Sequence, residues 1–194
     1  MELVRREWMP TCSMKRVVVH WTAGAYRASA IDRAHYHLLV EGDGAVVRGL
    51  HSIQTNAAAQ EPRASHTRNC NTVSIGIAVC CMENARERPF DPGPFPMTLH
   101  QWNTMAQVVA ELCHRYGIRV SARTVLAHGE VQSTLGIPQS GKWDPVVLPW
   151  APTQDRPEVM DTFRDRVRQH VTVLQARQAG APNVTEQAAA GNQL

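Results

Sequence analysis

A short loop near residue 140 places a cation and a carboxylate almost side by side. In the pentapeptide GKWDP, residues 141–145, Lys142 stands two positions before Asp144 on a backbone stiffened by a tryptophan and a proline. This pattern alone is common in surface turns. It gains meaning from His20 and His128, each of which closes a short β-branched run. Two histidines and one carboxylate can hold a zinc ion and leave its fourth position open for water, which is the arrangement of a hydrolytic site.

Predicted β-strands position both histidines. The run from Val17 to Trp21 has the composition of a buried strand, so His20 lies at its carboxyl end. A second strand is predicted over 123–127 and leads directly to His128. Ligands of open α/β sheets gather at the carboxyl ends of strands, so both histidines stand where such sites form. We predict a loop over 129–141 that leads on to the charged pentapeptide.

The surrounding pattern alternates helices and strands. In the hairpin that follows the first helix, Tyr36, Leu38 and Val40 are expected to share one face. Gly76, in the central strand, would let another group approach the backbone closely. Residues 83–96 contain four prolines and are expected to form a connection that covers one edge of the site. The elements expected here are a short helix over 27–35, hairpin strands over 36–40 and 45–48, a central strand over 72–81, a helix over 98–116 and an amphipathic helix after Pro157.

Composition restricts the classes of function. The 194 residues are 43% hydrophobic and 19% charged, as in an ordinary soluble globular protein. A net charge of +3 suits an anionic polymer such as a cell wall, but without a basic cluster it does not indicate nucleic-acid binding. No apolar run approaches the length of a transmembrane helix, so we expect no membrane span.

The termini and the cysteines bear on where the protein is made. Five cysteines without a CxxC pair are interpreted as reduced thiols. The amino-terminal residues lack the apolar segment of a signal peptide, so we expect synthesis in the cytoplasm. One domain is expected over residues 1–175. A disordered tail is expected over 176–194, because after Gly180 the chain is dominated by Ala, Gln, Asn and Gly.

Five segments, in order, resemble the zinc-dependent N-acetylmuramoyl-L-alanine amidases. This family includes amidase-type phage lysozymes, bacterial muropeptide-recycling amidases and peptidoglycan recognition proteins. The resemblance spans roughly residues 15–150 and implies an α/β fold with a mixed central β-sheet flanked by helices, in agreement with the pattern above. The segments are VVVHWTAG with His20, AHYHLLVEGDG with Tyr36, ASHTRNCNTVSIGIA with His66, VLAHGEV with His128, and GKWDP with Lys142 and Asp144.

The resemblance implies a role for each of these residues. His20, His128 and Asp144 would be the ligands of Zn²⁺, with a carboxylate where some members have a cysteine. Lys142 would stabilise the negative charge that develops on the carbonyl oxygen of the substrate. Tyr36 would position the attacking water and help pass its proton to the leaving amine.

Several positions keep alternatives open. His66 is either a substrate-contacting residue of the pocket or a surface histidine, and Tyr36 is either catalytic or a packing residue. Glu130 either orients a ligand or forms a salt bridge. Recycling-type members carry a catalytic glutamate in the string SIGIE, whereas this chain reads SIGIA with Ala78. That departure excludes the glutamate mechanism and argues against a recycling role.

The implied activity is hydrolysis of the amide bond between N-acetylmuramic acid and L-alanine in peptidoglycan. The enzyme would be a phage or prophage endolysin, or a delivered wall-degrading enzyme, that acts on the cell wall after release. Peptidoglycan or a muropeptide is the expected partner, and the sequence indicates no oligomeric state. The alternatives are a non-catalytic peptidoglycan-recognition module and a cytosolic recycling amidase. Binding-only members lose a zinc ligand, whereas all three candidates are present here.

Overall fold

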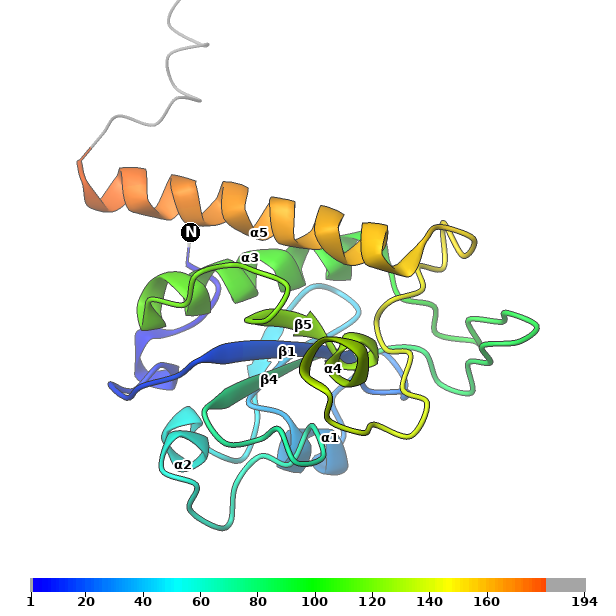
Figure 1. The fold of residues 1–194 in the computed structure, drawn as a ribbon, viewed down its shortest axis with the longest axis horizontal. Coiled ribbons are helices and arrows are strands. Elements are labelled where there is room, and N and C mark those ends of the chain that lie inside the picture. Colours follow the sequence, from blue (N-terminus) through cyan, green and yellow to red (C-terminus); the bar gives the residue numbers. More distant parts are fainter. Residues whose placement is uncertain (1, 181–194) are drawn as a thin grey trace, which may run out of the picture.

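A five-stranded mixed sheet forms the centre of the computed structural model, which describes residues 2–180 (Figure 1). The strand order is β3-β2-β4-β1-β5, in which β1, β2, β4 and β5 pair in parallel and β3 pairs antiparallel with β2. This confirms the predicted α/β fold with a mixed central sheet and flanking helices in a single domain. The strands are β1 (Arg16–Trp21), β2 (Leu38–Val40), β3 (Val46–Arg48), β4 (Ser74–Val79) and β5 (Val125–Ala127).

Helices cover both faces of the sheet. The long helices α3 and α5 pack on one face, and the shorter α1, α2 and α4 lie on the other (Figure 1). No helix within residues 2–180 is long and apolar enough to cross a membrane. The helices are the 3₁₀ turn η1 (Arg6–Trp8), α1 (Ala30–His35), α2 (Ile53–Ala57), α3 (Leu99–Tyr116), α4 (His128–Leu135) and α5 (Arg156–Gln178).

The two faces of the sheet bury different kinds of side chain. Val17 and Val19 of β1 join the large core under α3 and α5, whereas Val18 packs in a small cluster against α4. Because successive side chains of a strand alternate, His20 falls on the same face as Val18. The large apolar core therefore lies on one side of the sheet and His20 on the other.

The predicted long helices form for the expected reasons. Thr98 and Gln101 make a reciprocal capping box at the start of α3, and Gly117 ends it in a left-handed conformation. Trp102, Met105 and Val109 of its apolar stripe are buried against the sheet. On α5, the expected apolar face is likewise buried or partly buried against α3, and the residues are Val159, Phe163, Val167, Val171 and Leu174.

Tyr36 is not in the hairpin strand, contrary to the sequence prediction. The capping box of Ser29 and Asp32 sets the start of α1, and the Tyr36 amide donates to the Asp32 carbonyl at its end. Tyr36 therefore packs with Leu39 and Ala78, on the face opposite Leu38 and Val40. The residue still precedes β2 directly, which keeps it beside the carboxyl end of α1.

Two predicted loops also differ from the structure. The segment 129–141 begins as helix α4, because the Glu130 carboxylate accepts the hydrogen bond of the Ala127 amide at its start. In the proline-rich segment 83–96, Arg86 and Asp91 pair through their backbones and fold the segment on itself. None of its residues lines the cavity formed by the predicted site residues, so the prediction that this segment covers an edge of the site is not confirmed.

The predicted boundary at residue 175 falls inside α5, which continues to Gln178. Of the expected tail over 176–194, residues 181–194 lie outside the described residues.

Candidate functional site

Three side chains far apart in sequence converge on the face of the sheet opposite α3. His20 comes from β1, His128 is the first residue of α4, and Asp144 comes from the GKWDP loop. The Nδ1 atoms of the two histidines are 3.1 Å apart, and they lie 3.1 and 3.3 Å from the same Asp144 Oδ2 atom. All three side chains are buried.

A glutamine fixes the tautomer of His128. The Gln139 amide nitrogen donates to the carbonyl oxygens of Arg68 and Ile137, so its Oε1 atom is left to accept. His128 Nε2 lies 2.9 Å from that oxygen and must carry the proton. The Nδ1 atom of neutral His128 therefore presents a lone pair to Asp144.

A second hydrogen-bond chain fixes the tautomer of His20. His66 Nε2 lies 3.4 Å from the Ser74 carbonyl, which can only accept, so His66 Nδ1 is an acceptor. The Thr67 hydroxyl donates to His66 Nδ1 across 2.8 Å. His20 Nε2, 3.3 Å from both that hydroxyl and His66 Nδ1, is then the donor, and its Nδ1 lone pair faces Asp144.

Three acceptors pointing at one another require a positive charge between them. A proton could supply it, but burial lowers the pKa of His20 to about 4, which disfavours an imidazolium at neutral pH. Burial acts to raise the pKa of Asp144, yet its interactions with His128 and His20 hold that pKa below the ordinary value. A tetrahedral metal ion with bonds of about 2.0 to 2.1 Å would place its ligand atoms about 3.3 Å apart, close to the distances here. The three residues thus fit a metal ion.

The GKWDP loop is anchored from two sides. The Gly129 amide, next to His128, donates to the backbone carbonyl of Asp144 at 2.8 Å. Trp143 packs edge to face on Trp21 of β1, with ring centroids 4.6 Å apart. A Cβ at Gly129 would come within 3.1 to 3.3 Å of this loop, so the glycine permits the close approach. Asp144 is held against both histidine-bearing elements.

A cavity of about 470 Å³ opens beside the three residues. His20 is fully buried behind it, and the other predicted site residues line it: Tyr36, His66, His128, Lys142 and Asp144. Serine, arginine and asparagine side chains complete a polar wall. A larger cavity of about 850 Å³ between α3 and α5 contains none of the six predicted residues.

Tyr36, His66 and Lys142 differ in how they face this cavity. The Tyr36 ring lies 5.1 Å from the His20 ring, and burial raises the pKa of its hydroxyl, so that hydroxyl is protonated at neutral pH. His66 is buried and lies 3.3 Å from the His20 side chain. It therefore contacts His20 and exposes only a small part of its ring to the cavity. Lys142 is exposed at the rim.

Sequence reasoning missed three residues of the site. Gln139 contacts His128 from within a predicted loop, Thr67 contacts His20, and His35 lines the cavity, and none of the three is among the predicted site residues. The adjacency of Thr67 to His66 was the one usable signal. For Gln139 the sequence offers none, because its contact with His128 depends on how the chain turns after α4.

A family model described as N-acetylmuramoyl-L-alanine amidase matches residues 10–146. That match covers most of the chain, including all six predicted site residues. The chain belongs to this family. A comparison with curated protein sequences gave no match.

Solved structures of other proteins resemble this family member at low identity. The Ph2119 endolysin from a Thermus scotoductus bacteriophage is 20% identical, with a TM-score of 0.46, over 80% of this chain and 88% of its own. The Staphylococcus aureus hydrolase AmiA is 16% identical, with a TM-score of 0.49, over 88% and 77%. A bumblebee peptidoglycan recognition protein, PGRP-SA, is 18% identical, with a TM-score of 0.41, over 71% and 87%.

Family membership and the converging His20, His128 and Asp144 side chains support a role on peptidoglycan, as an amidase or as a recognition protein.

Proposed function

We propose that this protein is a zinc-dependent amidase that hydrolyses the bond between N-acetylmuramic acid and L-alanine in peptidoglycan. The observation that carries the proposal is the convergence of two histidine lone pairs on one Asp144 oxygen at 3.1 and 3.3 Å. Family membership supplies the substrate class. A recognition protein needs no such cluster, so the complete donor set favours the enzyme.

Zinc, held by His20, His128 and Asp144, would supply a Lewis acid that polarises the scissile carbonyl and acidifies water. The protein itself sets the geometry of that chemistry. The hydrogen bonds that the imidazoles of His128 and His20 donate to Gln139 and Thr67 keep both rings turned with Nδ1 toward Asp144. Their burial excludes competing water from the ligands.

Lys142 would stabilise the oxyanion of the tetrahedral intermediate. It lies two residues from Asp144 at the rim of the same cavity, so its ammonium group can reach a carbonyl bound there. Charge that develops in the transition state is stabilised most by a donor already in place. The exposed position of Lys142 at the rim also leaves the cavity open for a polymer to enter.

Tyr36 would hold the attacking water and return a proton to the leaving amine. Its hydroxyl is protonated at neutral pH because burial raises its pKa, so it acts first as a hydrogen-bond donor and acceptor. Ala78 packs in the same small cluster and offers no carboxylate for this task. His66, bonded to His20, would support the metal site as well as contact substrate.

We further propose that the enzyme acts on the cell wall, as an endolysin or a delivered wall-degrading enzyme, rather than in recycling. Intact sacculi would then be hydrolysed at least as readily as soluble muropeptides. A recycling enzyme would show the opposite preference. The alanine at position 78 supports the first role.

The decisive experiment is incubation of the purified protein with sacculi, followed by mass analysis for peptides with a free L-alanine amino terminus. The wild-type protein should release them with zinc and stop when a chelator is added. Asp144→Asn, which keeps the shape but removes the charge, should retain no zinc and release none. Binding to sacculi without release would instead establish the recognition role.

A further inference from the structure

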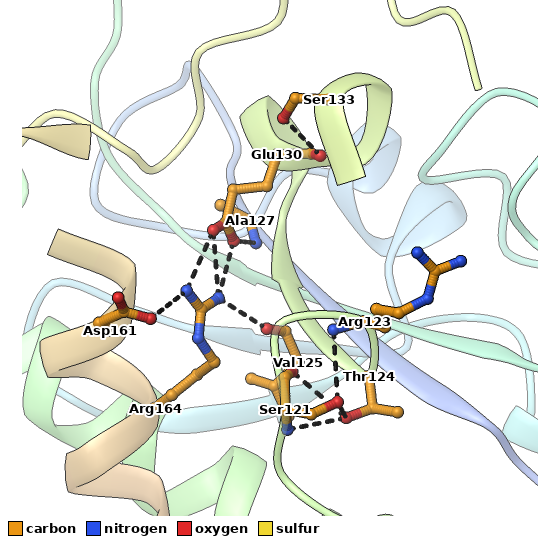
Figure 2. Close-up of polar contacts among 9 residues, drawn as sticks. All are labelled: Ser121, Arg123, Thr124, Val125, Ala127, Glu130, Ser133, Asp161 and Arg164. Carbon is orange, nitrogen blue, oxygen red and sulfur yellow. Dashed lines mark hydrogen bonds and ion pairs between the residues drawn. The ribbon is translucent and has the colours of Figure 1, made fainter. Parts of the chain in front are cut away.

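A buried arginine of α5 reaches round the edge of the sheet to the helix that carries His128. Arg164 is 3% exposed, and its guanidinium donates to both carboxylate oxygens of Glu130 at 3.0 to 3.2 Å. It also donates to the Val125 carbonyl at 3.2 Å (Figure 2). Because β5 is an edge strand, this contact joins the two helical layers without crossing the sheet.

Glu130 is tied in turn to the backbone that precedes His128. Its Oε2 atom accepts the hydrogen bond of the Ala127 amide at 2.9 Å, and Ala127 is the residue that caps α4 (Figure 2). The guanidinium thus forms hydrogen bonds with Val125, three residues before His128, and with Glu130, two residues after it. The backbone of this histidine is held on both sides.

The second carboxylate partner of Arg164 differs in place and exposure. Asp161 lies one turn earlier on α5 and accepts from the same guanidinium at 2.8 Å, but its side chain is 70% exposed. It touches neither α4 nor β5 in this network (Figure 2). Because the Asp161 carboxylate is largely in solvent, its interaction with Arg164 contributes little to stability, so Asp161 provides a matched control for Glu130.

We propose that Arg164 is a positioning residue for the metal site, which acts through Glu130 and Val125 on the backbone of His128. The inference rests on the proposed metal-dependent function. Metal ligands need placement to within about 0.5 Å, and a ligand at the junction of a strand and a helix depends on how that junction is held. A buried ion pair is a weak source of net stability, yet it fixes geometry because both partners are costly to leave unpaired.

The proposal also assigns a task to α5, which lies beyond residues 10–146 that match the family model. The helix contributes no side chain to the cavity beside His128. Through Arg164, α5 nevertheless helps to position His128. This separates its role from the apolar packing of Phe163 and Val167, which lie in the core under α3.

Zinc affinity, measured by competition with a chromophoric chelator, tests the proposal without any activity assay. The variants are Arg164→Met, Arg164→Lys, Glu130→Gln and the control Asp161→Asn. Loss of the contact in Arg164→Met or Glu130→Gln should weaken zinc binding about tenfold, as loss of groups that orient ligands does. Arg164→Lys should lie between these and the wild type, and Asp161→Asn should bind as the wild type does.

Two further measurements separate geometry from folding. Urea unfolding of the metal-free variants gives their stability, and the visible absorption of the Co²⁺-substituted proteins reports coordination geometry. We expect a changed cobalt spectrum in Glu130→Gln at temperatures where it is fully folded. If Arg164→Met does not fold, the zinc affinities of Glu130→Gln and Arg164→Lys, compared with that of Asp161→Asn, test the proposal.

Variants that lose stability but, once folded, bind zinc as tightly as the wild type would overturn the positioning role alone. A wild-type protein that binds no zinc would overturn the proposed function and this inference with it. The two failures are therefore distinguishable in one set of titrations.

Discussion

At the scale of single residues, the two lysines of the chain offer a clean test of oxyanion stabilisation. Lys142 lies at the rim of the cavity. Lys15 directly precedes β1, at the end of that strand opposite His20. Lys142→Met should lower kcat for peptide release about 100-fold or more, since loss of an oxyanion contact costs on the order of 3 kcal/mol. Lys15→Met should be unaffected. Equal activity of both variants on sacculi would remove Lys142 from the chemistry.

Tyr36 can be tested by deleting one oxygen atom. Tyr36→Phe should lower kcat about 100-fold through loss of proton transfer, while zinc content by atomic absorption stays at one ion per chain. The matched control is Tyr116→Phe, which removes a hydroxyl that donates to Pro10 far from the cavity. Unchanged turnover in Tyr36→Phe would show that the tyrosine only packs against His20.

The site residues that could be predicted from the sequence are those whose side-chain type is required to bind a metal ion. His20, His128 and Asp144 were recognisable from strand ends and from the family's motifs, and the structure brings them together. Gln139 and Arg164 were not, because in the sequence each looks like an ordinary solvent-exposed polar residue, although both are buried in the structure. Their roles arise only from contacts across 11 and 34 residues of chain.

At the scale of elements, β4 supports the site through one glycine. A Cβ at Gly76 would lie 2.3 Å from the His66 ring, so the ring packs directly on the strand, as the sequence led us to expect of this glycine. Gly76→Ala should displace His66, lower the free energy of unfolding by about 1 to 3 kcal/mol and weaken zinc binding. Urea unfolding and chelator competition measure the two effects.

A second substitution can separate these effects. Gly76→Ala combined with His66→Ala restores space, so stability should partly recover while zinc affinity stays low. Recovery of both would mean that His66 does not orient His20.

Element boundaries were less predictable than element types. The strands and long helices follow from apolar periodicity, but the extent of α1 and the existence of α4 depend on carboxylates at capping positions, Asp32 and Glu130. Asp32 and Glu130 can be read from the sequence, but the sequence does not indicate which backbone amide each carboxylate would cap. The placement of Tyr36 shifted as a result.

At the scale of the whole molecule, buried histidines make the fold sensitive to mild acid. Burial lowers the pKa of His37 and of His20 to about 4, below the ordinary value of about 6.5. The unfolded chain therefore binds protons that the folded chain excludes, so stability is complete above about pH 6.5 and falls as the pH drops toward 4. The slope is up to about 1.4 kcal/mol per pH unit for each such histidine.

Urea unfolding of the metal-free protein at pH 7.5, 6 and 5 measures this loss. The variant His37→Gln should show a shallower decline than the wild type. A free energy of unfolding that stays constant from pH 7.5 to 5 would contradict the prediction. Zinc should raise the stability without flattening this dependence, because it keeps the imidazoles that bind it neutral in the folded chain while the unfolded chain still takes up protons.

The spacing of the ligands along the chain has a consequence for biosynthesis. Contacts of His20 with His128 and Asp144 close loops of 108 and 124 residues, so the proposed metal site cannot be complete until most of the chain has left the ribosome. Arg164 emerges later still. If the protein binds zinc as proposed, the complete ligand set would form only after β5 has paired with β1, because His128 and Asp144 both follow β5 in the chain. Activity would therefore appear only at the end of folding, which delays hydrolysis until the enzyme is complete.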